Sequence, residues 1–192
     1  MVQTVLSRDS GDSARDALRL AAIDVVERAR TSAVTFAQIA EAAEVDADVA
    51  SALYSTVDDL LVDAALRMCA EELRLATVAV TVGAPPVSSY AHHFARRRSF
   101  YRAMRVGPVA QKLDARMAEL VAPLIAAQIR TLVGARMTDD DIDAMTAEVT
   151  AESFEVTNGW IVASGDAEGA ESLYVRLEAI VVRRFAEISP LD

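Results

Sequence analysis

The sequence predicts an all-α protein of about nine helices, in which a small N-terminal helix-turn-helix head precedes a larger helical body. Hydrophobic residues make up 53% of the 192 residues and aromatic residues only 5%, so the core is aliphatic and suits packed helices. Apolar residues recur at three- and four-residue spacing, and no segment shows the sustained alternation of a strand. The clearest break is Gly83-Ala-Pro-Pro86. We therefore expect a head at 1–62 and a body at 63–192.

The first half of the chain is expected to hold four helices. Residues 1–12 are polar and predicted to be loose, and Ser13 can cap a first helix that runs to about residue 30. Thr35 can cap a short second helix, with Gln38 at the capping-box position. After a turn at Glu44, the third helix is expected from a cap at Asp46 to about Leu53, and the fourth over about 57–82.

The second half reads as longer helices. A helix is expected over about 87–105, where Gly107-Pro108 ends it, and another over 109–136, which Pro123 should kink or divide. Thr138 can cap a helix that runs to about 163, with three acids in its first turn, where the helix dipole favours them. The turn Ser164-Gly-Asp then leads to the last helix, at about 167–188.

Charge is unevenly distributed along the chain. The net charge is −10, and residues 1–62 carry five arginines against eleven acids. From Thr31 to Leu66 there is no lysine or arginine at all. Phosphate contacts, made mostly by cations, dominate the affinity of proteins for DNA. The charge therefore opposes the function that the helix-turn-helix pattern favours.

The segment TFAQIAEAAEVDADVASALYSTVDDLL resembles the DNA-binding head of the TetR/AcrR family of bacterial repressors. The spacing matches without a gap, and helix count, total length and the long fourth helix agree in layout. The matching positions are Thr35, Ile39-Ala40, Ala43-Glu44-Val45, Tyr54 and Leu60-Leu61. The resemblance implies an all-α fold, a DNA-binding head, and a body that binds a ligand and dimerises.

Several positions depart from the family pattern. The family glycines of the turn and of the end of the first helix are Glu44 and Arg30 here, and the lysine that usually starts the fourth helix is Val57. The third helix presents acids where the family presents a basic residue, so its contacts with DNA should be weak or atypical. The resemblance places candidate DNA-facing residues at Thr35, Gln38, Asp46, Ala47, Ser51 and Tyr54.

A stripe of large side chains in the body is a candidate ligand chamber. Tyr90, Phe94, Tyr101 and Met104 share one face of the helix expected at 87–105. Apolar walls with few polar groups suit an apolar or amphipathic small molecule. The alternative is a plain packed core. The full candidate set for ligand binding is Tyr90, Phe94, Tyr101, Met104, Met117, Phe154 and Trp160.

The cluster Arg96-Arg97-Arg98 is the densest positive stretch. It reads either as a solvated face that pairs with the acidic head, or as an anion-binding wall or docking face for an acidic partner. The last two helices carry apolar stripes suited to a symmetric dimer. The expected interface residues are Val149, Val156, Leu173, Leu177, Ile180 and Val181.

Other classes of function lack support in the sequence. We find no catalytic arrangement and no metal-binding motif, and we expect no enzyme activity, no metal and no cofactor. Cys69 is the only cysteine and fits a buried, inert thiol. No signal peptide or apolar run long enough to span a membrane is present, so a soluble, cytoplasmic protein is expected.

Two functions therefore remain for this sequence. One is a ligand-responsive transcriptional repressor of the TetR type, acting as a homodimer on operator DNA through unusual contacts. The other is a module on the same scaffold that has lost DNA and binds a small molecule or a protein partner.

Overall fold

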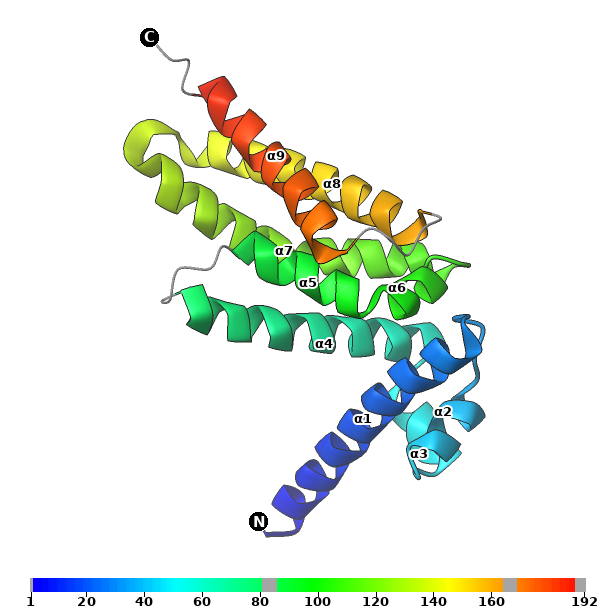
Figure 1. The fold of residues 1–192 in the computed structure, drawn as a ribbon. Coiled ribbons are helices and arrows are strands. Elements are labelled where there is room, and N and C mark those ends of the chain that lie inside the picture. Colours follow the sequence, from blue (N-terminus) through cyan, green and yellow to red (C-terminus); the bar gives the residue numbers. More distant parts are fainter. Residues whose placement is uncertain (1, 81–85, 164–168, 189–192) are drawn as a thin grey trace. The chain divides into compact units, whose positions relative to one another are not determined.

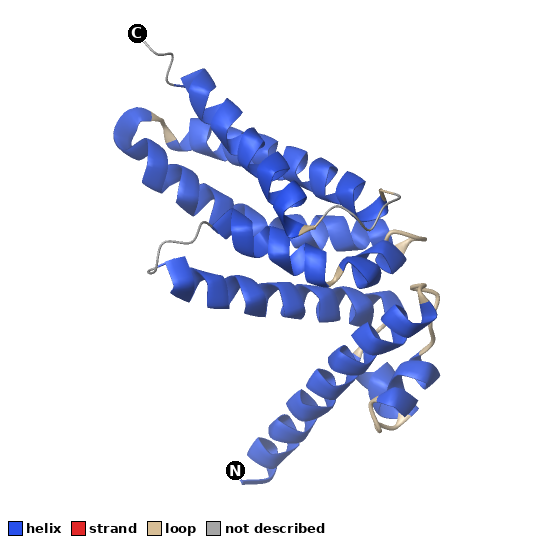
Figure 2. Ribbon diagram, viewed as in Figure 1, coloured by secondary structure: helices blue, strands red, loops and turns tan. Residues whose placement is uncertain are grey.

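A computed structural model describes residues 2–80, 86–163 and 169–188 of the chain. Within these ranges every regular element is a helix, with nine α-helices and one short 3-10 helix (Figure 1 and Figure 2). The all-α prediction is confirmed. The chain forms two compact units. Unit 1 comprises Met1–Met68 and Ser99–Leu113, and unit 2 comprises Cys69–Arg98 and Asp114–Asp192.

Three helices form the N-terminal part of unit 1, and α1 packs against the other two (Figure 1). On α1, Leu18, Ala22 and Val26 are fully buried, one turn apart from each other, so they form a single inward stripe. Ile39 and Ala50 are the fully buried residues of the two short helices. The helices are α1 (Val2–Ala29), α2 (Phe36–Ala42) and α3 (Ala47–Leu53).

The predicted caps of the helix-turn-helix are confirmed. The Thr35 side chain accepts a hydrogen bond from Gln38 N (3.3 Å), and Thr35 N donates to Gln38 Oε1 (2.9 Å), which completes a capping box. Asp46 caps α3 by accepting from Asp48 N at 2.8 Å. Local side-chain chemistry thus defines where both helices begin.

The first helix is longer than predicted, because α1 begins at Val2 and not at Ser13. Polar residues do not end a helix by themselves, and the segment before Ser13 contains no proline. Its one glycine, Gly11, lowers helix stability by only about 1 kcal/mol. The prediction that the polar residues 1–12 are loose was therefore wrong for the described part of this segment.

Unit 1 also contains chain from beyond the predicted head. The helix α4 (Val57–Val80) runs without a break past residue 62, and its second part belongs to unit 2. The segment Ser99–Leu113 returns to unit 1. Ser32 Oγ donates to the carbonyl of Val106 at 2.8 Å, and Lys112 Nζ forms an ion pair with Asp59. These bonds attach the later segment to the head.

Unit 2 is built around α9, which packs against both α5 and α8 (Figure 1). Thr138 caps the start of α8, as predicted, and Asp141 completes a capping box with it. Pro123 lies inside a continuous α7 and does not divide it. The elements are α5 (Pro86–Arg96), α7 (Val109–Val133, in unit 2 from Asp114), the 3-10 helix η1 (Gly134–Arg136), α8 (Asp139–Val162) and α9 (Ala170–Ile188).

The helix predicted over 87–105 is two helices in the structure. The first, α5, ends at Arg96, and α6 (Arg98–Met104) follows after a turn residue. The break falls at the point where the chain passes from unit 2 to unit 1. Of the other predicted breaks, residues 83–85 of the Gly-Ala-Pro-Pro segment and the turn at 164–166 lie outside the described residues.

Candidate functional site

The turn between α2 and α3 is built around a strained residue. Glu44 has φ +54°, in the left-handed region that glycine adopts most easily. Arg30, just after α1, also has φ +54°. These two positions are the ones where the resembled family carries glycine. The chain therefore adopts left-handed backbone geometry at both positions without glycine, the residue that adopts it at least cost.

The outer surface of the helix-turn-helix is acidic and partly apolar. Asp46, Ala47 and Asp48 are exposed at the start of α3, and Val49 is 41% exposed. The exposed Ser51 donates its hydroxyl to the carbonyl of Ala47 at 2.8 Å. With no lysine or arginine from residue 31 to 66, these two helices present no cation to a phosphate.

Tyr54 lies in the interior of the head and not on its surface. It is only 7% exposed, and its hydroxyl donates to Asp63 Oδ2 at 2.7 Å. Arg19 Nε donates to the same oxygen at 2.8 Å, and the Arg15 guanidinium lies 5.7 Å from the centre of the Tyr54 ring. Burial and the bond to Asp63 raise the pKa of Tyr54 to about 12. Tyr54 therefore acts as a structural residue here.

Arg15 and Arg19, two arginines of α1 that could otherwise contact DNA, both contact the Tyr54–Asp63 pair. Burial opposes the charge of Arg19, but its hydrogen bonds to Asp63 and Asp16 raise its pKa above the usual value. Asp63, which accepts hydrogen bonds from both Tyr54 and Arg19, was not among the residues predicted from the sequence. The only hint in the sequence was that Asp63 lies about one helical turn after the buried Leu60, so it lies near the inward face of α4.

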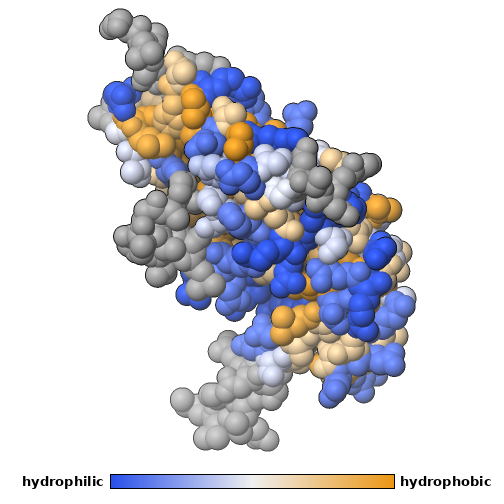
Figure 3. Space-filling view, in the orientation of Figure 1, coloured by the Kyte–Doolittle hydropathy of each residue, from blue (hydrophilic) through white to orange (hydrophobic). Residues whose placement is uncertain are grey.

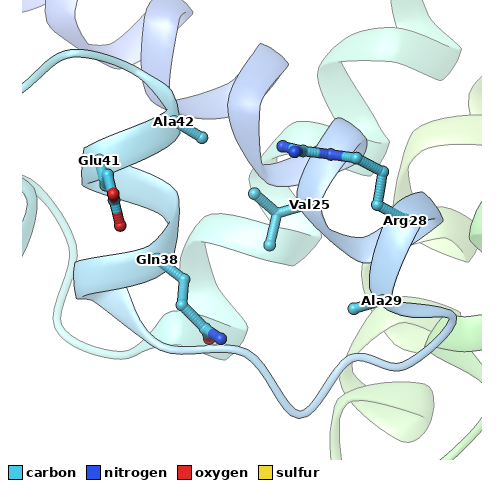
Figure 4. A pocket seen from close by; sticks show the side chains of 6 residues that line it. All are labelled: Val25, Arg28, Ala29, Gln38, Glu41 and Ala42. Atoms are coloured by element: carbon cyan, nitrogen blue, oxygen red, sulfur yellow. The ribbon is translucent and has the colours of Figure 1, made fainter.

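A groove of about 700 Å³ lies between α1 and α2 (Figure 4). Arg28 reaches from α1 toward α2, while Glu41 is turned away from it, and Gln38 lies at the lower edge (Figure 4). Arg28 is ion-paired with Asp24 at 2.9 Å and is two-thirds exposed. The groove is therefore part of the solvated head surface.

The residues predicted for the ligand chamber divide between the two units. Tyr90 and Phe94 belong to α5 in unit 2, with ring centroids 4.6 Å apart. Tyr101 and Met104 belong to α6 in unit 1, where both are fully buried. The four side chains therefore do not form one stripe on one helix. Met117 and Trp160 are buried in unit 2.

Phe154 lines a groove of about 520 Å³ between α7 and α8, entirely within unit 2. The other groove-lining residues were not singled out from the sequence. The available signal was alanine at four-residue spacing on both helices, at Ala118 and Ala122 and at Ala147 and Ala151.

Two arginines of the Arg96–Arg98 cluster form hydrogen bonds within unit 2. Arg98 Nη2 donates to the carbonyls of Trp160 (2.7 Å) and Ala163 (3.1 Å), and its guanidinium lies 4.2 Å from the centre of the Trp160 ring. Arg98 therefore satisfies the last carbonyls of α8. Arg96 forms a hydrogen bond with Glu72 on α4, also in unit 2. These contacts of Arg96 and Arg98 therefore lie within unit 2.

A buried histidine shares Glu72 with Arg96. The His93 side chain is fully buried, and its Nδ1 lies 3.2 Å from Glu72 Oε2. Burial lowers the pKa of His93, and the nearby carboxylate offsets this only in part. Burial alone would raise the pKa of Glu72, but Arg96 and His93 outweigh it and lower that pKa.

Cys69 lies one turn before Glu72 on α4 and is buried. Burial, aided by the charge of Glu72, raises the pKa of the Cys69 thiol to about 12. The thiol is therefore protonated and unreactive near neutral pH, as expected from the sequence.

Most residues predicted for the dimer interface are covered within the chain itself. Val149, Leu173, Leu177 and Ile180 are buried, and Val156 and Val181 are half-buried. The apolar side chains that α8 and α9 do expose are others, namely Val162 (53%), Val175 (53%) and Val182 (62%). Apolar residues also gather near the C-terminal half of α9 and the α7–α8 turn on the face drawn in Figure 3.

The described residues contain neither a metal-binding cluster nor a helix able to cross a membrane. No group of three or more histidine, cysteine or acidic side chains is arranged to hold a metal ion in the described ranges. None of the described helices is both long and apolar enough to cross a membrane.

Comparison with known proteins relates the fold to transcriptional regulators. No protein-family model and no curated protein matches the sequence. One similar structure is a Pseudomonas aeruginosa PAO1 protein assigned as a transcriptional regulator, with a TM-score of 0.58, 17% identity and 90% of each chain covered. Another is Thermus thermophilus FadR, a TetR-family repressor in complex with lauroyl-CoA. It has a TM-score of 0.54 and 19% identity, over 87% of this chain and 93% of FadR. The fold of this protein is thus TetR-like.

Proposed function

We propose that this protein is a TetR-like transcriptional regulator, acting as a repressor and as a homodimer, which responds to an apolar or amphipathic small molecule. The observation that carries the proposal is the helix-turn-helix at Thr35–Leu53, with both of its caps formed, on a TetR-like fold.

The head is proposed to bind DNA more weakly than typical relatives. Each cation that faces a phosphate releases counterions, and several such contacts normally sustain binding. Here α3 begins with Asp46 and Asp48, and Arg19 is held by Asp63. Acids can accept from cytosine, so they can contribute to sequence readout but not to general affinity.

The test is fluorescence anisotropy on a random DNA duplex at low and moderate salt. The triple variant Asp46→Ser, Asp48→Lys and Val57→Lys keeps a good helix cap at residue 46 and adds cations beside the phosphates. Its affinity should rise about tenfold at low salt, and the gain should shrink as salt is added. Sub-micromolar binding by the unmodified protein at physiological salt would contradict the proposed weakness.

A matched control separates location from net charge. Glu155→Lys and Glu171→Lys together change the net charge by the same amount, at exposed positions of α8 and α9 in unit 2. This control should leave DNA affinity nearly unchanged. An equal gain from the control would mean that net charge, and not the helix-turn-helix surface, determines binding.

The second candidate function is a module on the same scaffold that binds a small molecule or protein partner and no longer binds DNA. The absence of cations from residue 31 to 66 favours it. No binding by the unmodified protein at low salt, together with no gain in the triple variant, would support this function.

A further inference from the structure

The groove between α7 and α8 is kept open by small side chains. Ala118 and Ala122 lie one turn apart on α7, and Ala147 and Ala151 lie one turn apart on α8. Residues four apart share a helix face, so each pair forms a continuous low wall. The groove holds about 520 Å³, a size that suits a small ligand.

One wall of the groove contains a buried hydroxyl without a partner. Thr150 is only 7% exposed, and its Oγ1 has no hydrogen-bond partner among the described residues. One turn earlier, the equally buried Thr146 donates to the carbonyl of Ile142 at 2.7 Å, as threonines within helices commonly do. Buried polar groups are normally bonded, so a ligand with a polar atom beside Thr150 would complete the site.

The ionisable groups that line the groove carry one sign of charge. They are Asp114 and Glu119, and the described lining contains no lysine, arginine or histidine. Asn158 Nδ2 lies 3.5 Å from both carboxylate oxygens of Asp114. Glu119 is ion-paired with Arg116 at 3.4 Å but remains two-thirds exposed. A carboxylate or phosphate head would meet repulsion here, whereas an ammonium would be attracted.

We propose that the α7–α8 groove binds an amphiphilic amine. Its apolar body lies along the two alanine walls and against Phe154, a polar atom within that body bonds the Thr150 hydroxyl, and its ammonium lies near the acidic side chains of α7, Asp114 and Glu119. The role of this amine as the effector of a regulator rests on the proposed function. Its binding to the groove does not, because that binding requires no DNA.

Isothermal titration calorimetry with three aliphatic probes tests the proposal on the full-length protein. Dodecylammonium and dodecanoate share a chain and differ in the sign of their charge, and 3-(octyloxy)propylammonium adds an ether oxygen. Both amines should bind, and dodecanoate should bind about tenfold or more weakly. Equal binding of dodecanoate would overturn the assignment of charge.

Variants locate the site. Ala151→Leu fills the groove from an exposed helix position and should abolish binding of the amines, whereas Ala144→Leu, exposed on α8 outside the groove lining, should not. Glu119→Gln should weaken the amines and not the anion. Thr150→Val should remove any advantage of the ether amine over dodecylammonium. Unchanged binding in both Ala151→Leu and Glu119→Gln would overturn the site.

Two further measurements keep the outcome clear. Circular dichroism melting of each variant shows that it is folded before binding is compared. Sedimentation of Ala151→Leu shows whether a second copy of the chain covers the groove instead, because the variant would then dissociate, and that result would overturn the proposal. Failure of DNA binding would affect the regulator proposal and leave this result intact.

Discussion

At the scale of single residues, the two left-handed positions carry a measurable cost. A side chain at φ near +54° is less stable than in the right-handed region by about 1 kcal/mol, a penalty that glycine avoids. Glu44→Gly should therefore raise the free energy of unfolding in urea by up to about 1 kcal/mol. Glu41→Gly removes the same charge inside α2 and should lower it by about 1 kcal/mol. A loss in both variants would show that the conformational entropy cost of glycine exceeds the strain of Glu44 in the left-handed region.

The buried His93 predicts a pH dependence. Because burial lowers its pKa below the ordinary value of 6.5, the unfolded chain takes up a proton more readily than the folded one. The stability that this group contributes is full above about pH 6.5 and is lost as pH falls from there toward the pKa of the folded state. Urea unfolding from pH 8 to 5 should show this loss.

The neighbouring histidine provides the control for this pH effect. His93→Gln should flatten the decline between pH 6.5 and 5, whereas His92→Gln, at an exposed position, should reproduce the profile of the unmodified protein. The lowered pKa of Glu72 acts in the same direction at more acidic pH. Identical profiles for all three proteins would rule out His93 as the titrating group.

The sequence predicted residue roles well where the partners are local. Thr35 and Thr138 were assigned as caps because their partners lie three residues further on. Asp63 and Arg98 were not assigned, because their partners are distant in sequence: Arg98 contacts Trp160, 62 positions away. Helical periodicity carries no information about such pairs.

At the scale of elements, Arg98 stabilises the end of α8 within unit 2. It bonds two carbonyls that α8 cannot satisfy internally, and it also stacks on Trp160. Arg98→Met keeps the apolar stem and loses both interactions, so the free energy of unfolding should fall by about 2 kcal/mol. Arg130→Met, which breaks only exposed ion pairs longer than 3.5 Å, should cost less than about 0.5 kcal/mol.

Arg98→Lys distinguishes charge from shape. A lysine retains the charge but has no planar group to lie over the Trp160 ring as the guanidinium does, so most of the loss should persist. Full recovery with lysine would mean that charge at the end of α8 is sufficient.

Helix number and type were well predicted from apolar periodicity, while two boundaries were wrong. The polar start of α1 continues the helix because nothing in it breaks one. The α5–α6 break was missed because its cause is tertiary: the apolar spacing of Tyr90, Phe94, Tyr101 and Met104 is regular, yet the chain changes unit between them. Apolar spacing in the sequence did not distinguish one long helix with a single stripe from two short helices.

At the scale of the whole molecule, the proposed dimer must use residues that the single chain exposes. Val175 and Val182 lie two turns apart on α9 and are both more than half exposed. Replacing both with Glu should convert the dimer to monomer in sedimentation experiments, because charges in an apolar interface are costly. Val106→Glu, at a 66% exposed position of unit 1, should leave the dimer intact. A dimer that persists in the double variant would place the interface elsewhere.

Unit 1 consists of two separated stretches of chain, and this restricts how such a protein can diversify. A recombination event that transferred residues 1–62 to another body would carry Ser32 and Asp59 away from Val106 and Lys112, their partners in Ser99–Leu113. The transplanted block would lose those bonds. An intact exchange would therefore have to include Ser99–Leu113 as well, whereas point substitutions on the exposed faces of α2 and α3 leave these bonds in place.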